Sequence, residues 1–137
     1  MAKIALTDVK VLINSVNLSD HISSITIDTK TDVVDTTGFS STAAKTHSAG
    51  LKDNSVTIEF FQDFATSNVE QTIYPLLGTS TAVVISPIST SNGIVGNPTY
   101  SFNALVSEWT PLKGGVGELA TASVTWSIDG AITKVAV

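Results

Sequence analysis

Residues 55–60 have the sequence Ser-Val-Thr-Ile-Glu-Phe, and residues 120–128 have the sequence Ala-Thr-Ala-Ser-Val-Thr-Trp-Ser-Ile. In both stretches an apolar side chain occupies every second position, and a hydroxyl or acidic side chain occupies each position between. Successive side chains of a β-strand point to opposite faces, so this period of two predicts two half-buried strands. Each strand is expected to place one face on a core and the other in a polar environment.

The same alternation extends to most of the chain. Further strands are predicted over residues 8–13, 24–28, 81–86 and 100–107, with a weaker one over 31–36. Valine and isoleucine total 27 residues against 9 leucines, an excess of β-branched side chains that favours strands. The sequence therefore predicts an all-β fold of roughly seven to eight strands with one short helix, arranged as a sandwich or barrel, with residues 1–137 forming a single domain.

One segment has helical rather than strand spacing. Residues 67–70 (Ser-Asn-Val-Glu) match a capping box, in which a serine and a glutamate satisfy the first backbone amides of a helix. Apolar residues then recur at helical spacing up to Gly78, which occupies a typical position for a C-cap glycine. Pro75 limits the length, so a short, bent helix is predicted.

The polar segments between strands predict three loops, over residues 37–50, 86–98 and 110–118. The first is small, polar and aperiodic, and Phe39 is its only large apolar residue.

Charge is scarce in this chain. Charged residues make up 14% of the sequence, against about 25% in typical soluble domains, while serine and threonine supply 36 of the 137 residues. Either the surface is bland and hydroxyl-rich, or much of it is covered by neighbouring subunits, and obligate interfaces are depleted in charge. The net charge is −5, arginine is absent, and the seven lysines are scattered. Tight nucleic-acid binding needs clustered cations, so the chain is not expected to grip DNA.

The chemistry-bearing residues form no recognisable catalytic or metal-binding pattern. The absence of cysteine removes thiolate ligands and thiol nucleophiles, and His21 and His47 have no second ligand at metal-binding spacing. Four acids (Glu59, Asp63, Glu108 and Glu118) could converge as a two-carboxylate hydrolase only through the fold. We expect no enzyme, no cofactor and no metal. The N-terminus has no apolar core of a signal peptide, and no segment is long and apolar enough for a membrane helix, so no membrane role is expected.

Trp109 lies out of phase with its strand, on the face opposite Tyr100 and Phe102. An aromatic side chain in that position belongs either to a second core layer or to a subunit interface. The sequence leaves both alternatives open, so Trp109 is a candidate interface residue.

The order of these segments resembles a known family. A strand ends in Val16-Asn17-Leu18-Ser19-Asp20-His21, then come residues 34–39 (Val-Asp-Thr-Thr-Gly-Phe) and residues 50–61 (Gly-Leu-Lys-Asp-Asn-Ser-Val-Thr-Ile-Glu-Phe-Phe). The chain closes with Tyr100-Ser101-Phe102, continuing to Leu112, and Val124-Thr125-Trp126. Nearly the whole chain resembles the tail tube (major tail) proteins of long-tailed phages, and more loosely the tube subunits of contractile injection systems.

The resemblance implies two packed antiparallel sheets with a flanking helix, hexameric rings, and a hollow tube of stacked rings through which DNA passes. It implies self-association, together with tape-measure, tail-tip and tail-terminator partners, in a virion tail assembled in the host cytoplasm. Contact between rings would fall on the loop over residues 37–50, with Phe39, Ala43, Lys45, His47 and Ser48 as candidates. Strands near residues 56–60 and 124–128 would line the lumen, with Thr57, Glu59 and Asp63 facing it.

Two other functions fit the composition. A head decoration or cement protein, or a tail-completion protein, would also be small and β-rich but need not polymerise alone. An adhesive or carbohydrate-binding β-sandwich would fit the hydroxyl content and an exposed Trp109, and would normally be secreted.

Overall fold

The computed structural model describes residues 6–39, 43–65, 68–88 and 97–135, and within them the predicted alternation is confirmed. Val56, Ile58 and Phe60 are fully buried, while Thr57 and Glu59 face outward. The elements are β1 (Lys10–Ile13), β2 (Val16–Asn17), the 3-10 turn η1 (Ser19–His21), β3 (Ile22–Asp35), β4 (His47–Phe61), α1 (Val69–Ile73), the 3-10 turn η2 (Tyr74–Leu76), β5 (Ser80–Ser86), β6 (Thr99–Leu105) and β7 (Thr121–Val135).

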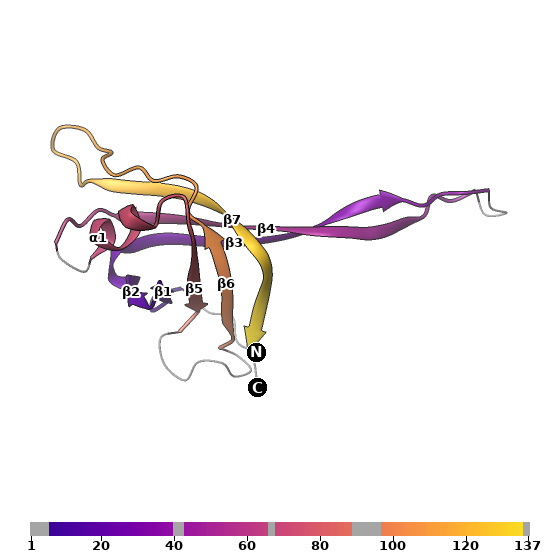
Figure 1. Cartoon of the computed structure of the whole chain (residues 1–137), viewed down its shortest axis with the longest axis horizontal. Helices are drawn as coiled ribbons and strands as arrows, with labels where there is room; N and C mark the ends of the chain where they lie inside the picture. Colours follow the sequence, from indigo (N-terminus) through magenta and orange to yellow (C-terminus); the bar gives the residue numbers. More distant parts are fainter. Residues whose placement is uncertain (1–5, 40–42, 66–67, 89–96, 136–137) are drawn as a thin grey trace.

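The seven strands form one antiparallel sheet in the order β2-β1-β5-β6-β7-β4-β3. Strand β7 joins its two halves, because residues 121–127 pair with β4 whereas most of residues 128–135 pair with β6. Just after this switch Gly130 has a φ of 91°, a backbone conformation that glycine adopts without steric cost. The sheet thereby folds over on itself, and β5 and β6 cross beneath β3 and β4 (Figure 1). The two predicted antiparallel layers are present, joined through one shared strand.

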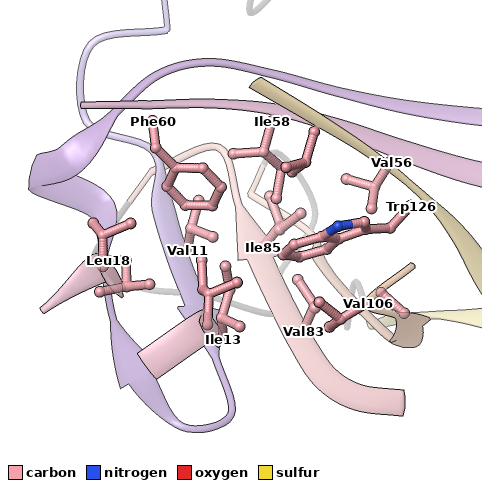
Figure 2. Close-up of a cluster of buried hydrophobic side chains, with 14 of the residues drawn as sticks. Val11, Ile13, Leu18, Val56, Ile58, Phe60, Val83, Ile85, Val106 and Trp126 are labelled. Atoms are coloured by element: carbon pink, nitrogen blue, oxygen red, sulfur yellow. The ribbon is translucent and has the colours of Figure 1, made fainter. Parts of the chain in front are cut away.

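The core lies between these two layers (Figure 2). Phe60 and Trp126 enter it from β4 and β7, and Val11, Ile13 and Val83 face them from β1 and β5. The indole Nε1 of Trp126 donates a hydrogen bond to the backbone oxygen of Glu108 at 2.9 Å, so its one polar atom is satisfied. Burial of each such apolar side chain contributes about 1.5–3 kcal/mol.

The outer part of the β3–β4 hairpin, residues 30–53, projects beyond this core as a long arm (Figure 1). The predicted loop over residues 37–50 is therefore wrong on its C-terminal side: residues 47–50 belong to β4, and Asp35, Val34 and Val33 pair with His47, Ser48 and Ala49. Both faces of the arm are exposed, so no period of two marks these residues. Residues 40–42 of the predicted loop lie outside the described residues.

A β-bulge bends the arm where Asp32 opposes both Gly50 and Leu51. A Cβ added at Gly50 would lie 3.1 Å from the Asp32 Cβ and 3.1 Å from the Val34 Cγ2. This close approach explains glycine at position 50.

The predicted helix is short, and Pro75 stands inside its terminal 3-10 turn, as expected. The capping arrangement differs from the prediction. Asn68 is the N-cap and makes no side-chain capping bond, and Ser67 lies outside the described residues. The Glu70 carboxylate instead accepts hydrogen bonds from Trp109 and Gln62, because these donors of the neighbouring loop and strand end converge on it.

Candidate assembly surfaces

The outward face of β3, β4 and β7 forms a regular array of short polar side chains. Register places Thr26, Thr57 and Thr125 in one row across the three strands, and the Thr57 and Thr125 hydroxyls lie 3.2 Å apart. Two flanking rows complete the array, Ser24–Glu59–Ser123 and Asp28–Ser55–Ser127. Seven of these nine side chains carry hydroxyls. We call this array the hydroxyl face.

The charges on the hydroxyl face are mainly acidic. Glu59 is exposed in one outer row, and Asp28 in the other lies 3.4 Å from Lys30 at the base of the arm. Thr57 and Glu59 thus lie on one face of β4, and Asp63 does not lie on it; that this face lines a lumen stays a prediction. Strand β4 ends at Phe61, and the Asp63 carboxylate accepts bonds from the Ala65 amide and the Asn68 side chain in the turn before α1.

The hydroxyl face is bordered by two strand edges. Strand β3 ends the sheet, and within the described residues no strand pairs with its outer edge. At the opposite border, the Thr125 amide points away from β4 and donates to the Glu108 carboxylate at 2.7 Å. The Thr121 amide donates to the Lys113 oxygen at 3.0 Å, so the loop between β6 and β7 meets this edge. The outer edge of β3 is therefore open to pairing with another chain, whereas the β7 border is partly covered by the chain's own loop.

The arm exposes apolar side chains that its own chain does not cover. Phe39 near the tip is fully exposed, and Leu51 and Val33 are 80% and 72% exposed. Among the residues predicted for ring contact, Phe39, Ala43 and Lys45 flank the tip, while His47 and Ser48 lie in the first residues of β4. The structure thus gathers all five at the outer end of the arm.

Hydrogen bonds join the two strands near the outer end of the arm, at residues 35–37 and 46, which we call the neck. The Thr36 amide donates to the Thr46 oxygen at 3.0 Å, and the Thr37 hydroxyl both donates to the Thr46 oxygen and accepts from the Thr46 amide. The Asp35 carboxylate accepts from the Thr37 amide at 2.8 Å. Hydrogen bonds from the Thr37 side chain and backbone hold the pKa of Asp35 below its ordinary value of 3.8.

Trp109 packs inside its own chain. Its ring meets Phe60 edge to face with centroids 5.6 Å apart, and its Nε1 donates to Glu70 at 2.8 Å. Of the two alternatives for Trp109, the structure shows the second core layer, and a role at a subunit interface stays a prediction. Sequence reasoning missed the role of Glu70 because its two donors lie 8 and 39 residues away along the chain.

The described residues contain no group of three or more side chains suited to hold a metal ion. His21 lies 3.7 Å from Asp63, and His47 lies far along the chain on the arm. Among the described helices, none has the length and apolar character of a membrane span.

Comparison with solved structures identifies the fold. A chain in the virion of a native gene transfer agent particle aligns with a TM-score of 0.75 and 12% identity, over 94% of this chain and 96% of that chain. A chain of the SPP1 tail tube aligns with a TM-score of 0.70 and 13% identity, over 95% and 77%. A chain in the tail of an empty gene transfer agent particle, refined with C6 symmetry, aligns with a TM-score of 0.62 and 16% identity, over 85% and 83%.

No protein-family model and no curated protein matches the sequence. The likeness to solved structures therefore establishes the fold, which is the tail-tube fold that the sequence resemblance predicted.

Proposed function

We propose that this chain is a structural virion protein that self-assembles into hexameric rings, which stack into a hollow tail tube through which DNA passes. The observation that carries the proposal is the hydroxyl face bordered by two sheet edges. In this role the chain has no catalytic activity and needs no cofactor.

The open outer edge of β3 supports ring formation. In the ring, the outer edge of β3 in one copy would meet the β7 border of the next copy, where the β6–β7 loop is bonded to Thr121 and Thr125 and takes part in the contact. A ring that closes removes all such edges, as a barrel does. Six copies per ring agrees with the C6 symmetry of the gene transfer agent tail that shares the fold.

The hydroxyl face supports the passage of DNA. In a closed ring this face would line the lumen and present Glu59 from every copy. A surface of hydroxyls and carboxylates offers no cation cluster to displace phosphate counterions, so it repels the duplex weakly and does not hold it. Asp28 contributes less to this repulsion because Lys30 lies beside it.

The exposed arm supports stacking of the rings. Its apolar side chains would be covered when an arm reaches the adjacent ring, which accounts for residues such as Phe39 being left in water in the single chain. The proposal extends to tape-measure, tail-tip and tail-terminator proteins as partners, and to a virion tail assembled in the host cytoplasm.

Negative-stain electron microscopy and light scattering of the purified chain across a concentration series test the proposal. We expect hollow filaments with a central hole at high concentration. The matched variant replaces residues 37–45 with Asn-Gly, which closes β3 and β4 through a two-residue turn between Thr36 and Thr46. This variant should form single rings but no tubes.

A chain that stays monomeric at every concentration contradicts self-assembly and favours the decoration or adhesive alternatives. Normal tubes from the shortened variant contradict a stacking role for residues 37–45 while leaving ring formation intact.

A further inference from the structure

We propose that Phe39, at the outer end of the arm of one copy, docks on the β6–β7 loop, residues 106–120, of a second copy in the next ring. This inference rests on the proposed function, since it names the surface that receives the arm.

The two surfaces lie at opposite ends of the molecule. The arm extends from one end of the long axis, and the β6–β7 loop lies beside α1 at the other end (Figure 1). A chain cannot bring its own two ends together, so contact between them requires a second copy. Head-to-tail contact of this kind leaves one tip and one loop unused at the ends of every assembly, which makes growth open-ended.

Both surfaces are apolar and uncovered. The loop exposes Leu112 at 75%, Val116 completely and Leu119 at 67%, and the arm exposes Phe39 completely. Three large apolar side chains exposed within one short loop indicate an interaction site rather than ordinary surface scatter. An aromatic side chain such as Phe39 is a typical anchor in such a contact.

The loop is held in place by the body of the protein. Glu70 accepts the Trp109 Nε1 hydrogen bond at 2.8 Å, and Gln62 donates to Glu70 at 3.1 Å and to the Pro111 oxygen at 2.5 Å. The backbone oxygen of Lys113 accepts a hydrogen bond from the amide of Thr121, the first residue of β7. Docking on a surface that is already fixed costs less conformational entropy than docking on a free loop.

The charges of the two ends also favour contact. The arm, residues 30–53, contains three lysines and three aspartates, while the β6–β7 loop, residues 106–120, contains Glu108, Lys113 and Glu118. The arm thus has a net charge of zero and the loop a net charge of −1, so most of the net charge of −5 resides in the rest of the chain. Approach of the ends avoids the repulsion that acidic surfaces would impose, and each charge can find an opposite partner.

Engineered cysteines test this contact, because the chain contains none of its own. We combine Gly38→Cys, where an added Cβ meets no atom within 4 Å, with the exposed Val116→Cys, and oxidise the assembled protein. A non-reducing gel should show a ladder of dimers, trimers and higher species that extends beyond six copies. The control combines Gly38→Cys with Leu105→Cys, on the outward side of β6, and should give no ladder.

Each outcome has one meaning. A ladder longer than six copies, absent from the control and from both single variants, supports docking between rings. Tubes without a ladder overturn the docking inference and leave the proposed function standing, and a ladder that stops at six copies overturns the assignment to successive rings. A chain that light scattering shows to be monomeric contradicts the proposed function itself.

Discussion

The two halves of the β3–β4 hairpin share one backbone ladder and have opposite environments. In the inner half every second side chain of β4 enters the core, and Ile58 and Phe60 are fully buried. In the arm all side chains of residues 31–39 and 43–53 are exposed. Backbone pairing is therefore sufficient to shape the arm, whereas the inner half is also fixed by hydrophobic burial. The arm thus has backbone pairing without a buried face, whereas the inner half has both.

The largest expected effect is on the free energy of unfolding, when one phenylalanine in each half of the hairpin is replaced by alanine. Phe60→Ala should lower the free energy of unfolding by about 4 kcal/mol, because it leaves a cavity in the core. Phe39→Ala should change it by less than about 0.5 kcal/mol, because that ring contacts only solvent in the single chain. Urea unfolding of both variants under conditions that keep the chain monomeric measures the difference. Equal losses would break the comparison between the two halves.

A second, smaller effect is on the rate at which backbone amides exchange with solvent through local opening of the hairpin. Backbone amides of the arm around Ala49 should exchange with solvent at least about a hundredfold faster than those around Ile58, since the arm can open without exposing the core. Native-state hydrogen exchange by NMR on the monomer, followed by mass spectrometry on tubes, measures this. Assembly should slow exchange in the arm and leave the inner half unchanged. Protection of the arm equal to that of the inner half in the monomer would refute its independence.

The smallest effect is the acid sensitivity of the neck. The lowered pKa of Asp35 means that its ionised form is favoured in the folded arm, so this contribution is present above the ordinary value of 3.8 and is lost as pH falls through the lowered pKa. An NMR titration should show the Thr37 amide resonance shifting with a midpoint below 3.8, with the unfolding of the core unaffected. Asp35→Asn is the control and should abolish that shift. A midpoint at or above 3.8 would contradict the hydrogen bond from Thr37.

Several elements of the fold were predictable because burial leaves a pattern in the sequence. The alternation over residues 55–60 and 120–128 predicted the parts of β4 and β7 that cover the core, and it predicted that Thr57 and Glu59 point away from the core. The short helix was equally visible, since Val69 and Ile73 follow its buried face.

Other features depended on contacts that no local pattern records. Asp63 follows Glu59 by an even number of residues, so the alternation predicts it on the same strand face as Thr57 and Glu59. Strand β4 ends at Phe61, however, and Asp63 lies in the turn that follows. The arm residues 47–50 escaped detection because a strand exposed on both faces carries no periodic signal. Glu70 and Trp109 meet only because the β6–β7 loop folds back over α1.

The sequence by itself determined an all-β protein with one short helix, sparse charge and a polar face on its central strands, because side-chain burial imposes a period that residues reveal locally. Only the tertiary structure decided that β7 joins both layers, that the β3–β4 hairpin projects as an arm, and that apolar surfaces lie at both ends of the molecule. Those features arise from pairing between distant segments, whose free energy depends on the whole arrangement rather than on any one stretch of residues.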